Sequence, residues 1–157
     1  MTGVLYSFDT SVLINGRRDL LPPDVFPTPW ALIEQMIVTG SIRAVDVVRD
    51  ELAKKDDTTK IWAEAQVDLF VPLEGDIQVA TTRTLAAHPR LIGRGGARNA
   101  ADPFVIGLAR ARSGVVVTEE TRTSNPTSNP RIPDVCNALG VRCVNLVGFI
   151  REQGWRF

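Results

Sequence analysis

Four acidic residues lie far apart in the chain, at positions from which their carboxylates could share one site. They are Asp9, Glu51, Asp102 and Glu120. The first and last follow short apolar runs typical of buried strands, and sites in open parallel sheets form outside the carboxyl ends of strands. Carboxylates that gather without a cation repel one another, and Mg²⁺ or Mn²⁺ relieves this repulsion through its preference for oxygen ligands. Such ions support attack of water on a phosphodiester, so the set predicts metal-dependent hydrolysis.

Each acid also has a purely structural alternative. These alternatives are helix capping for Asp9 and for Asp102, pairing with Lys55 for Glu51, and a solvated loop for Glu120. Taken singly, each acid is weak support for a site. Their order and their contexts together favour one.

Apolar runs and helical patterns alternate along the chain and indicate the elements that would position these acids. Strands are expected at 4–8, 42–45, 115–117 and 141–146. Helices are expected at 10–15, 28–39, 46–55, 57–69, 77–87, 102–113, 133–139 and 147–153, with Thr28, Asp46 and Asp102 as N-caps. This alternation predicts a three-layer α/β/α sandwich with a mainly parallel sheet, in a single domain spanning residues 1–157.

Length and composition exclude several classes of protein. The chain has 157 residues, of which 44% are hydrophobic, enough for one domain with a sizeable core. Cys136, Cys143 and His88 are too few for a disulfide framework or a zinc finger. There is no run of ~18 apolar residues and no basic segment before the first apolar run, so we expect no membrane span, no signal peptide and a cytoplasmic location.

The formal net charge is zero, but the charge is unevenly distributed. Residues 1–89 carry 8 Lys/Arg and 13 Asp/Glu, whereas residues 90–157 carry 10 Arg and 5 Asp/Glu. The balance excludes a strongly basic, non-specific nucleic-acid binder, while the arginine-rich second part favours contacts to phosphate groups. Candidate RNA-binding residues are Arg94 and Arg98 in a glycine-rich segment, and Arg122 and Arg131 near the fourth acid.

Four short motifs, in this order, resemble those of the PIN domain, the nuclease fold of many VapC-type toxins. They lie at 6–14, 47–52, 101–109 and 115–120, each with one of the four acids. The resemblance implies an α/β/α ribonuclease that uses Mg²⁺ or Mn²⁺ held by those acids. It also implies that Thr10 and Ser11 help to orient the site, and that Thr118 contacts the metal ligands without binding the metal itself.

The chain departs from the family pattern at the fourth motif. Glu120 stands where Asp is commoner, and a long loop follows it. The fourth carboxylate therefore remains open among Glu120, Glu119 and Asp134, which follows the loop. The segment 132–136 and the aromatic tail 154–157 resemble a less-characterised PIN branch.

The expected function is hydrolysis of RNA phosphodiester bonds, by the toxin of a toxin–antitoxin pair. An antitoxin protein or a second copy of the chain could cover the apolar surface of helix 28–39 and the aromatic tail. The alternative is a PIN-like module that binds RNA or protein without cutting. A phosphatase with an aspartyl nucleophile is disfavoured, because Ser11 stands where its second Asp is needed.

Overall fold

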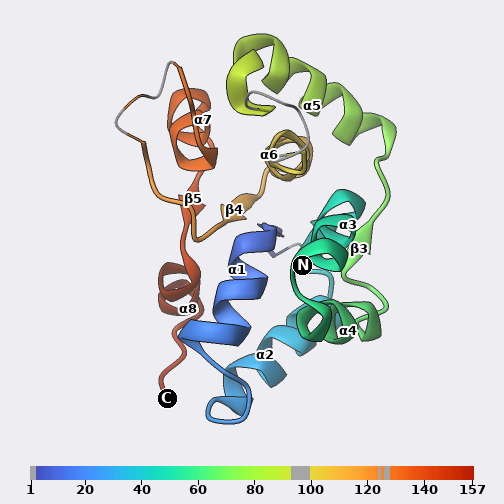
Figure 1. Cartoon of the computed structure of the whole chain (residues 1–157), viewed down its shortest axis with the longest axis vertical. Coiled ribbons are helices and arrows are strands. Elements are labelled where there is room, and N and C mark those ends of the chain that lie inside the picture. The colour runs from blue at the N-terminus through green and yellow to red at the C-terminus, as the bar shows by residue number, and fades with distance from the viewer. Residues whose placement is uncertain (1–2, 93–99, 124, 126–127) are drawn as a thin grey trace.

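A five-stranded parallel sheet forms the centre of the protein (Figure 1). The computed structural model describes residues 3–92, 100–123, 125 and 128–157. The strand order is β3-β2-β1-β4-β5, so the first strand lies in the middle. The strands are β1 (Tyr6–Phe8), β2 (Ile42–Val45), β3 (Phe70–Val71), β4 (Val115–Val117) and β5 (Cys143–Val144).

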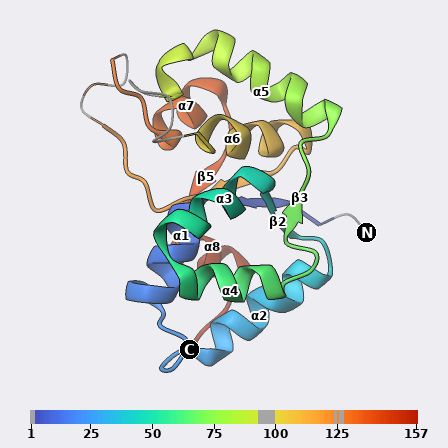
Figure 2. The same ribbon diagram turned by 45° about the vertical axis from the view of Figure 1, so that its right-hand side comes forward.

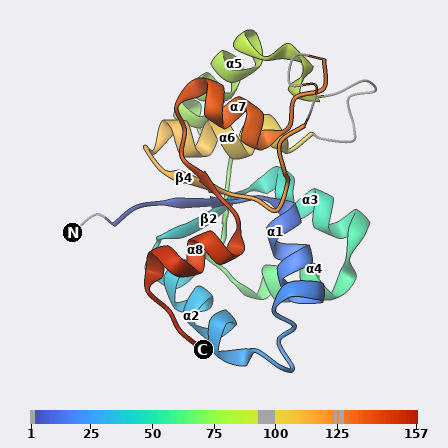
Figure 3. The ribbon, with the colours of Figure 1, turned by 90° about the vertical axis from the view of Figure 1, so that its left-hand side faces the viewer.

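Helices cover both faces of this sheet, which confirms the expected α/β/α sandwich. Figures 2 and 3 show α5, α6 and α7 on one face, and α1, α2, α4 and α8 on the other. The helices are α1 (Thr10–Asn15), α2 (Pro27–Val38), α3 (Asp46–Lys55), α4 (Asp57–Ala65), α5 (Gly75–Ala87), α6 (Asp102–Ala111), α7 (Ile132–Leu139) and α8 (Leu146–Gln153), with a π-helical turn η1 (Gly16–Leu20) and a 3-10 turn η2 (Pro89–Ile92).

The central strands are buried on both faces, as expected for a parallel sheet between helices. Every residue of β1 and of β4 is buried. Phe149 of α8 packs edge-to-face against Tyr6 and Phe8 on one side, with ring centroids 4.8 and 5.2 Å away. On the other side, Gly107 lets α6 approach Thr81 of α5 so closely that a Cβ atom would collide with the Thr81 side chain.

The N-caps of α2, α3 and α6 lie one or two residues before the expected ones. Helix α2 begins at Pro27 with Phe26 as its N-cap, because proline at the first helical position already has the required φ. Val45 precedes α3 as its N-cap, so Asp46 is the first helical residue. At α6 the Ala101 carbonyl accepts from the Val105 N–H (2.9 Å), which makes Ala101 the N-cap and corrects the assignment of that role to Asp102.

The edges of the sheet were predicted less well than its centre. The helix expected over 57–69 ends at Ala65, and Leu69 instead leads into β3, a strand that no apolar run indicated. At the other edge β5 contains only Cys143 and Val144, because the following residue, Asn145, caps α8 through its side chain.

Among the residues that the structure describes, no helix has both the length and the apolar character needed to cross a membrane.

Candidate functional site

The site lies where the chain connections of the sheet reverse direction, between β1 and β4. Connections from β1 lead to β2 and β3 on one side, whereas β4 and β5 lie on the other. Phe8 and Val117 are paired in register, so the residues after them emerge side by side. The Asp9 N–H donates to the Val117 carbonyl (3.0 Å) and holds the two strand ends together. Ligands of open α/β sheets bind in the crevice at such a switch point.

Hydroxyl groups from both strand ends hold the Asp9 carboxylate in one orientation. Ser11 Oγ and Thr118 Oγ1 both donate to Asp9 Oδ2, at 2.7 and 2.9 Å, and lie 3.1 Å from each other. The same hydroxyls accept backbone N–H groups of the next turn, from Glu119 (3.0 Å) and Glu120 (3.1 Å). Ser11 and Thr118 therefore fix both the first acid and the segment that carries the fourth.

Glu51 joins three elements through its two carboxylate oxygens. Thr10 Oγ1 of α1 donates to Glu51 Oε2 (2.7 Å), and the backbone N–H of Ala101 donates to Oε1 (3.1 Å). The alternative role of Glu51 was an ion pair with Lys55. No such ion pair is present among the described residues. The half-buried carboxylate instead links α1, α3 and the start of α6.

Asp102 lies at the first position of α6 with 6% of its surface exposed. Because Ala101 takes the capping position, the Asp102 side chain is not used as an N-cap. Among the described residues it makes no hydrogen bond, and it lines the same pocket as Asp9 and Glu51. Buried charges are ordinarily hydrogen-bonded or paired, which offsets the cost of removing them from water. Asp102 has no such partner among the described residues.

The structure separates the three candidates for the fourth acid. Glu120 lines the pocket that holds the other acids, and its buried Oε2 atom has no hydrogen-bond partner among the residues that the structure describes. Glu119 turns away and accepts the backbone N–H of Leu146 at the start of α8 (2.7 Å). Asp134 accepts the N–H groups of Arg131 (2.9 Å) and Thr123 (3.2 Å) and so stabilises the start of α7. Only Glu120 of the three faces the pocket.

The four acids thus line one pocket of about 280 Å³, in which the pKa values of Asp9, Asp102 and Glu120 are raised. Burial is the main cause of the raised pKa of Asp9, and the Glu51 charge adds to it. Burial and then the charges of Asp9, Glu120 and Glu51 raise the pKa of Asp102 to about 9. Burial and Asp9 raise the pKa of Glu120 to about 7, although the Ile132 N–H and Arg131 act in the opposite direction.

The donor set of this pocket has the chemistry that a hard divalent cation requires. All four acids offer oxygen, and among the described residues neither Asp102 nor Glu120 forms an ion pair. Among the described residues, no three Asp, Glu, His or Cys side chains form a ready-made group of metal ligands. Mg²⁺ does not require three protein ligands, because it commonly binds through one or two carboxylates and completes its coordination shell with waters and substrate phosphates. The residues therefore fit Mg²⁺ or Mn²⁺ held by one or two carboxylates from the set Asp9, Glu51, Asp102 and Glu120.

The basic residues near the pocket are only partly those expected. Arg122 lines a neighbouring pocket, and Arg131 lies on the surface within 3.4 Å of the Thr121 hydroxyl. Arg94 and Arg98 lie outside the described residues. Arg18 was not among the candidate residues, yet it lines the acidic pocket together with Asn15 and Lys55. The helical spacing of residues 11, 14, 15 and 18 places them on one face, and this pattern in the sequence could have indicated that Arg18 lies near Ser11.

Comparison with known proteins places the chain in a family. The family model described as "Domain of unknown function (DUF4411)" matches residues 6–157, from β1 to the last residue. The chain belongs to this family. No curated protein matches the DUF4411 chain. The family description names no activity, so the function of this DUF4411 protein is argued from the site.

Proposed function

We propose that this DUF4411 protein is a metal-dependent endoribonuclease that hydrolyses RNA phosphodiester bonds. The observation that carries the proposal is the pocket in which Asp9, Glu51, Asp102 and Glu120 meet, although they come from four separate parts of the chain. A bound Mg²⁺ or Mn²⁺ would supply charge stabilisation and activation of a water molecule. The resemblance of the four motifs to the PIN domain supports the same activity.

The residues of the chain provide the positioning that such a reaction needs. Ser11 and Thr118 hold Asp9, while Thr10 holds Glu51, so neither carboxylate can rotate freely. Asp102 and Glu120 contribute carboxylate oxygens that lack a hydrogen-bond partner among the described residues. Arg18, which also pairs with Asp19 (3.0 Å), and Lys55 line the pocket and offer positive charge to substrate phosphates. His88 lies outside the pocket and has no part in the proposed reaction.

Cleavage of single-stranded RNA with and without EDTA tests this proposal. The wild type should cut RNA in Mg²⁺ or Mn²⁺ and stop in EDTA, whereas Asp9→Asn and Asp102→Asn should lose on the order of 100-fold or more of the activity. Asp134→Asn is a matched control, because it removes one carboxylate outside the pocket and should cleave like the wild type. Undiminished cleavage by both pocket variants would overturn the assignment.

The same resemblance supports a role as the toxin of a toxin–antitoxin pair in the cytoplasm. Such a toxin should arrest growth when it is expressed, and Asp9→Asn should abolish the arrest. An antitoxin protein, or a second copy of the chain, would cover surface now exposed, which includes Val38 of α2 and the terminal Phe157 (72% and 60% exposed). Co-purification with the product of a small neighbouring reading frame would identify the antitoxin.

A second candidate function is binding of RNA without cleavage. It is favoured by the lack of a ready-made group of three metal ligands among the described residues. Metal-dependent turnover separates the two, since a binding module would retain RNA in Mg²⁺ without shortening it.

A further inference from the structure

A second pocket adjoins the acidic one and has a different chemical character. Its volume is about 390 Å³, within the range that holds small organic ligands. Thr118 and Glu120 belong to its wall, and Glu120 also lines the acidic pocket, so the two spaces share a border. The remaining lining residues are Thr121, Arg122, Pro133, Asn137, Val141, Cys143, Val144 and Asn145.

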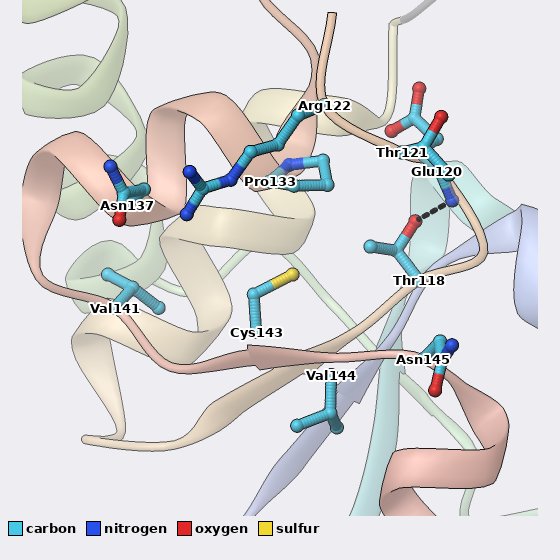
Figure 4. Close-up of a pocket in the computed structure, with 10 residues that line it drawn as sticks. All are labelled: Thr118, Glu120, Thr121, Arg122, Pro133, Asn137, Val141, Cys143, Val144 and Asn145. Carbon is cyan, nitrogen blue, oxygen red and sulfur yellow. Dashed lines mark hydrogen bonds between the residues drawn. The ribbon is translucent and has the colours of Figure 1, made fainter.

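Figure 4 shows how these side chains divide the second pocket into polar and apolar parts. Arg122 extends along one side toward Asn137, and Asn145 lies at the opposite end. Val141 and Pro133 supply apolar surface, whereas the Val144 side chain lies on the opposite side of β5, against Gly148 of α8. The Cys143 sulfur lies on the same side of β5 as Pro133 and Arg122. Among the described residues, Arg122 forms no ion pair and Asn137 makes no side-chain hydrogen bond, so both can bind a ligand.

We infer that this second pocket binds the nucleoside next to the phosphate that the acids act on. The inference rests on the proposed function and names the part of the RNA that each space would receive. Bases of single-stranded RNA are splayed out, stack on guanidinium planes and donate or accept hydrogen bonds at their edges. Arg122 offers such a plane, and the Asn137 amide offers both a donor and an acceptor. The Asn145 Oδ1 atom accepts the Gly148 N–H (2.8 Å), so Asn145 offers its NH₂ group as a donor. The shared wall at Glu120 sets the base beside the acids, as a nucleotide flanking the scissile bond requires.

The position of Arg122 separates this role from a general attraction to phosphate. Arg18 and Lys55 already line the acidic pocket, whereas Arg122 borders a pocket that combines polar side chains with the apolar Val141 and Pro133. A planar base has both an apolar face and polar edges, and it matches this combination. The second pocket therefore selects for nucleosides.

Chemical labelling of Cys143 tests the inference without any cleavage. Cys143 is partly exposed in the pocket, whereas Cys136 is buried, so iodoacetamide should modify only Cys143 in the folded protein. In EDTA, a short single-stranded RNA at ten times its Kd leaves about a tenth of the protein free, so labelling should slow roughly tenfold. Cys143→Ser, which should show no labelling, identifies the reporter. Heparin of matched charge should not protect the thiol. Equal protection by heparin, or none by RNA, would overturn the nucleoside pocket.

Binding of the same RNA to variants gives a second measurement. Arg122→Gln and Asn137→Ala change exposed side chains and should each raise the Kd in EDTA about threefold to tenfold. Arg83→Gln removes one arginine from α5, outside both pockets, and should leave the Kd unchanged. Unchanged Kd values for both pocket variants would overturn the inference even if Mg²⁺-dependent cleavage is found. Conversely, protection of Cys143 in EDTA together with a lack of cleavage in Mg²⁺ or Mn²⁺ would refute the nuclease and leave the pocket standing.

Discussion

Thr118 Oγ1 donates a hydrogen bond of 2.9 Å to Asp9 Oδ2, although 109 positions separate the two residues in the chain. The contact exists because β1 and β4 are parallel neighbours with Phe8 opposite Val117, so that the next residue of each strand reaches the same edge. One hydroxyl thereby orients the first acid of the pocket and, by accepting the Glu120 N–H (3.1 Å), also holds the backbone of the fourth.

Loss of this hydroxyl should weaken activity more than loss of the methyl group beside it. Thr118→Val keeps the shape but removes the bond to Asp9 and should reduce kcat about 10- to 100-fold. Thr118→Ser retains the hydroxyl and should recover most of the activity. The measurement is the rate of RNA cleavage at saturating Mg²⁺, with thermal unfolding as a control for folding. Equal activity of the two variants would contradict a positioning role for the hydroxyl.

Neutralising Asp102 should stabilise the metal-free protein. The carboxylate is nearly buried beside Asp9 and Glu120, so Asp102→Asn removes repulsion and should raise stability by about 1–2 kcal/mol, or roughly 3–6 °C in Tm. Thermal unfolding in EDTA measures the change. Asp134→Asn is the control and should lower stability by about 0.5–1 kcal/mol, since it removes a negative charge at the start of α7. A lower Tm for Asp102→Asn would indicate that this carboxylate stabilises the helix instead.

Stability of the metal-free protein should fall as the pH rises. The folded-state pKa values of Asp102 (about 9) and Glu120 (about 7) lie above their ordinary values of 3.8 and 4.5. Between these limits the folded state binds more protons than the unfolded state, so the free energy of unfolding decreases with pH. The decrease begins above about pH 4 and is complete near pH 9. Urea unfolding from pH 5 to 9 in EDTA checks this, and Mg²⁺ should reduce the loss at the alkaline end. Stability that rises steadily over this range in EDTA would refute the assigned repulsion.

The neighbouring residues Glu119 and Glu120 should respond oppositely to the same substitution. Glu120→Gln removes a pocket carboxylate and should lower cleavage on the order of 100-fold or more. Glu119→Gln should keep most of the activity and lose about 0.5–1 kcal/mol of stability, because the Glu119 carboxylate lies at the N-terminus of α8. Cleavage rates and urea unfolding of both variants check the pair. Loss of activity in Glu119→Gln alone would exchange the two assignments.

Much of the fold followed from local patterns in the sequence. Short, mostly apolar runs predicted β1, β2 and β4, because strands covered on both faces are rich in apolar residues. Glycine and proline marked most helix ends to within two residues. The two edge strands were harder to predict, since β3 and β5 have two residues each and their pairing depends on neighbours distant in sequence. A strand of two residues has no pattern of its own.

The sequence by itself determined which carboxylates are available and that two of them follow strands. It did not decide among Glu119, Glu120 and Asp134, nor whether Asp102 caps its helix. Those points depended on the tertiary structure, because they concern the direction of side chains within one turn. Glu119 accepts the Leu146 N–H, and Asp134 accepts the Arg131 N–H. Of the three acids, Glu120 therefore faces the pocket. The register of β1 against β4 similarly placed Thr118 beside Asp9, a contact that local sequence cannot encode.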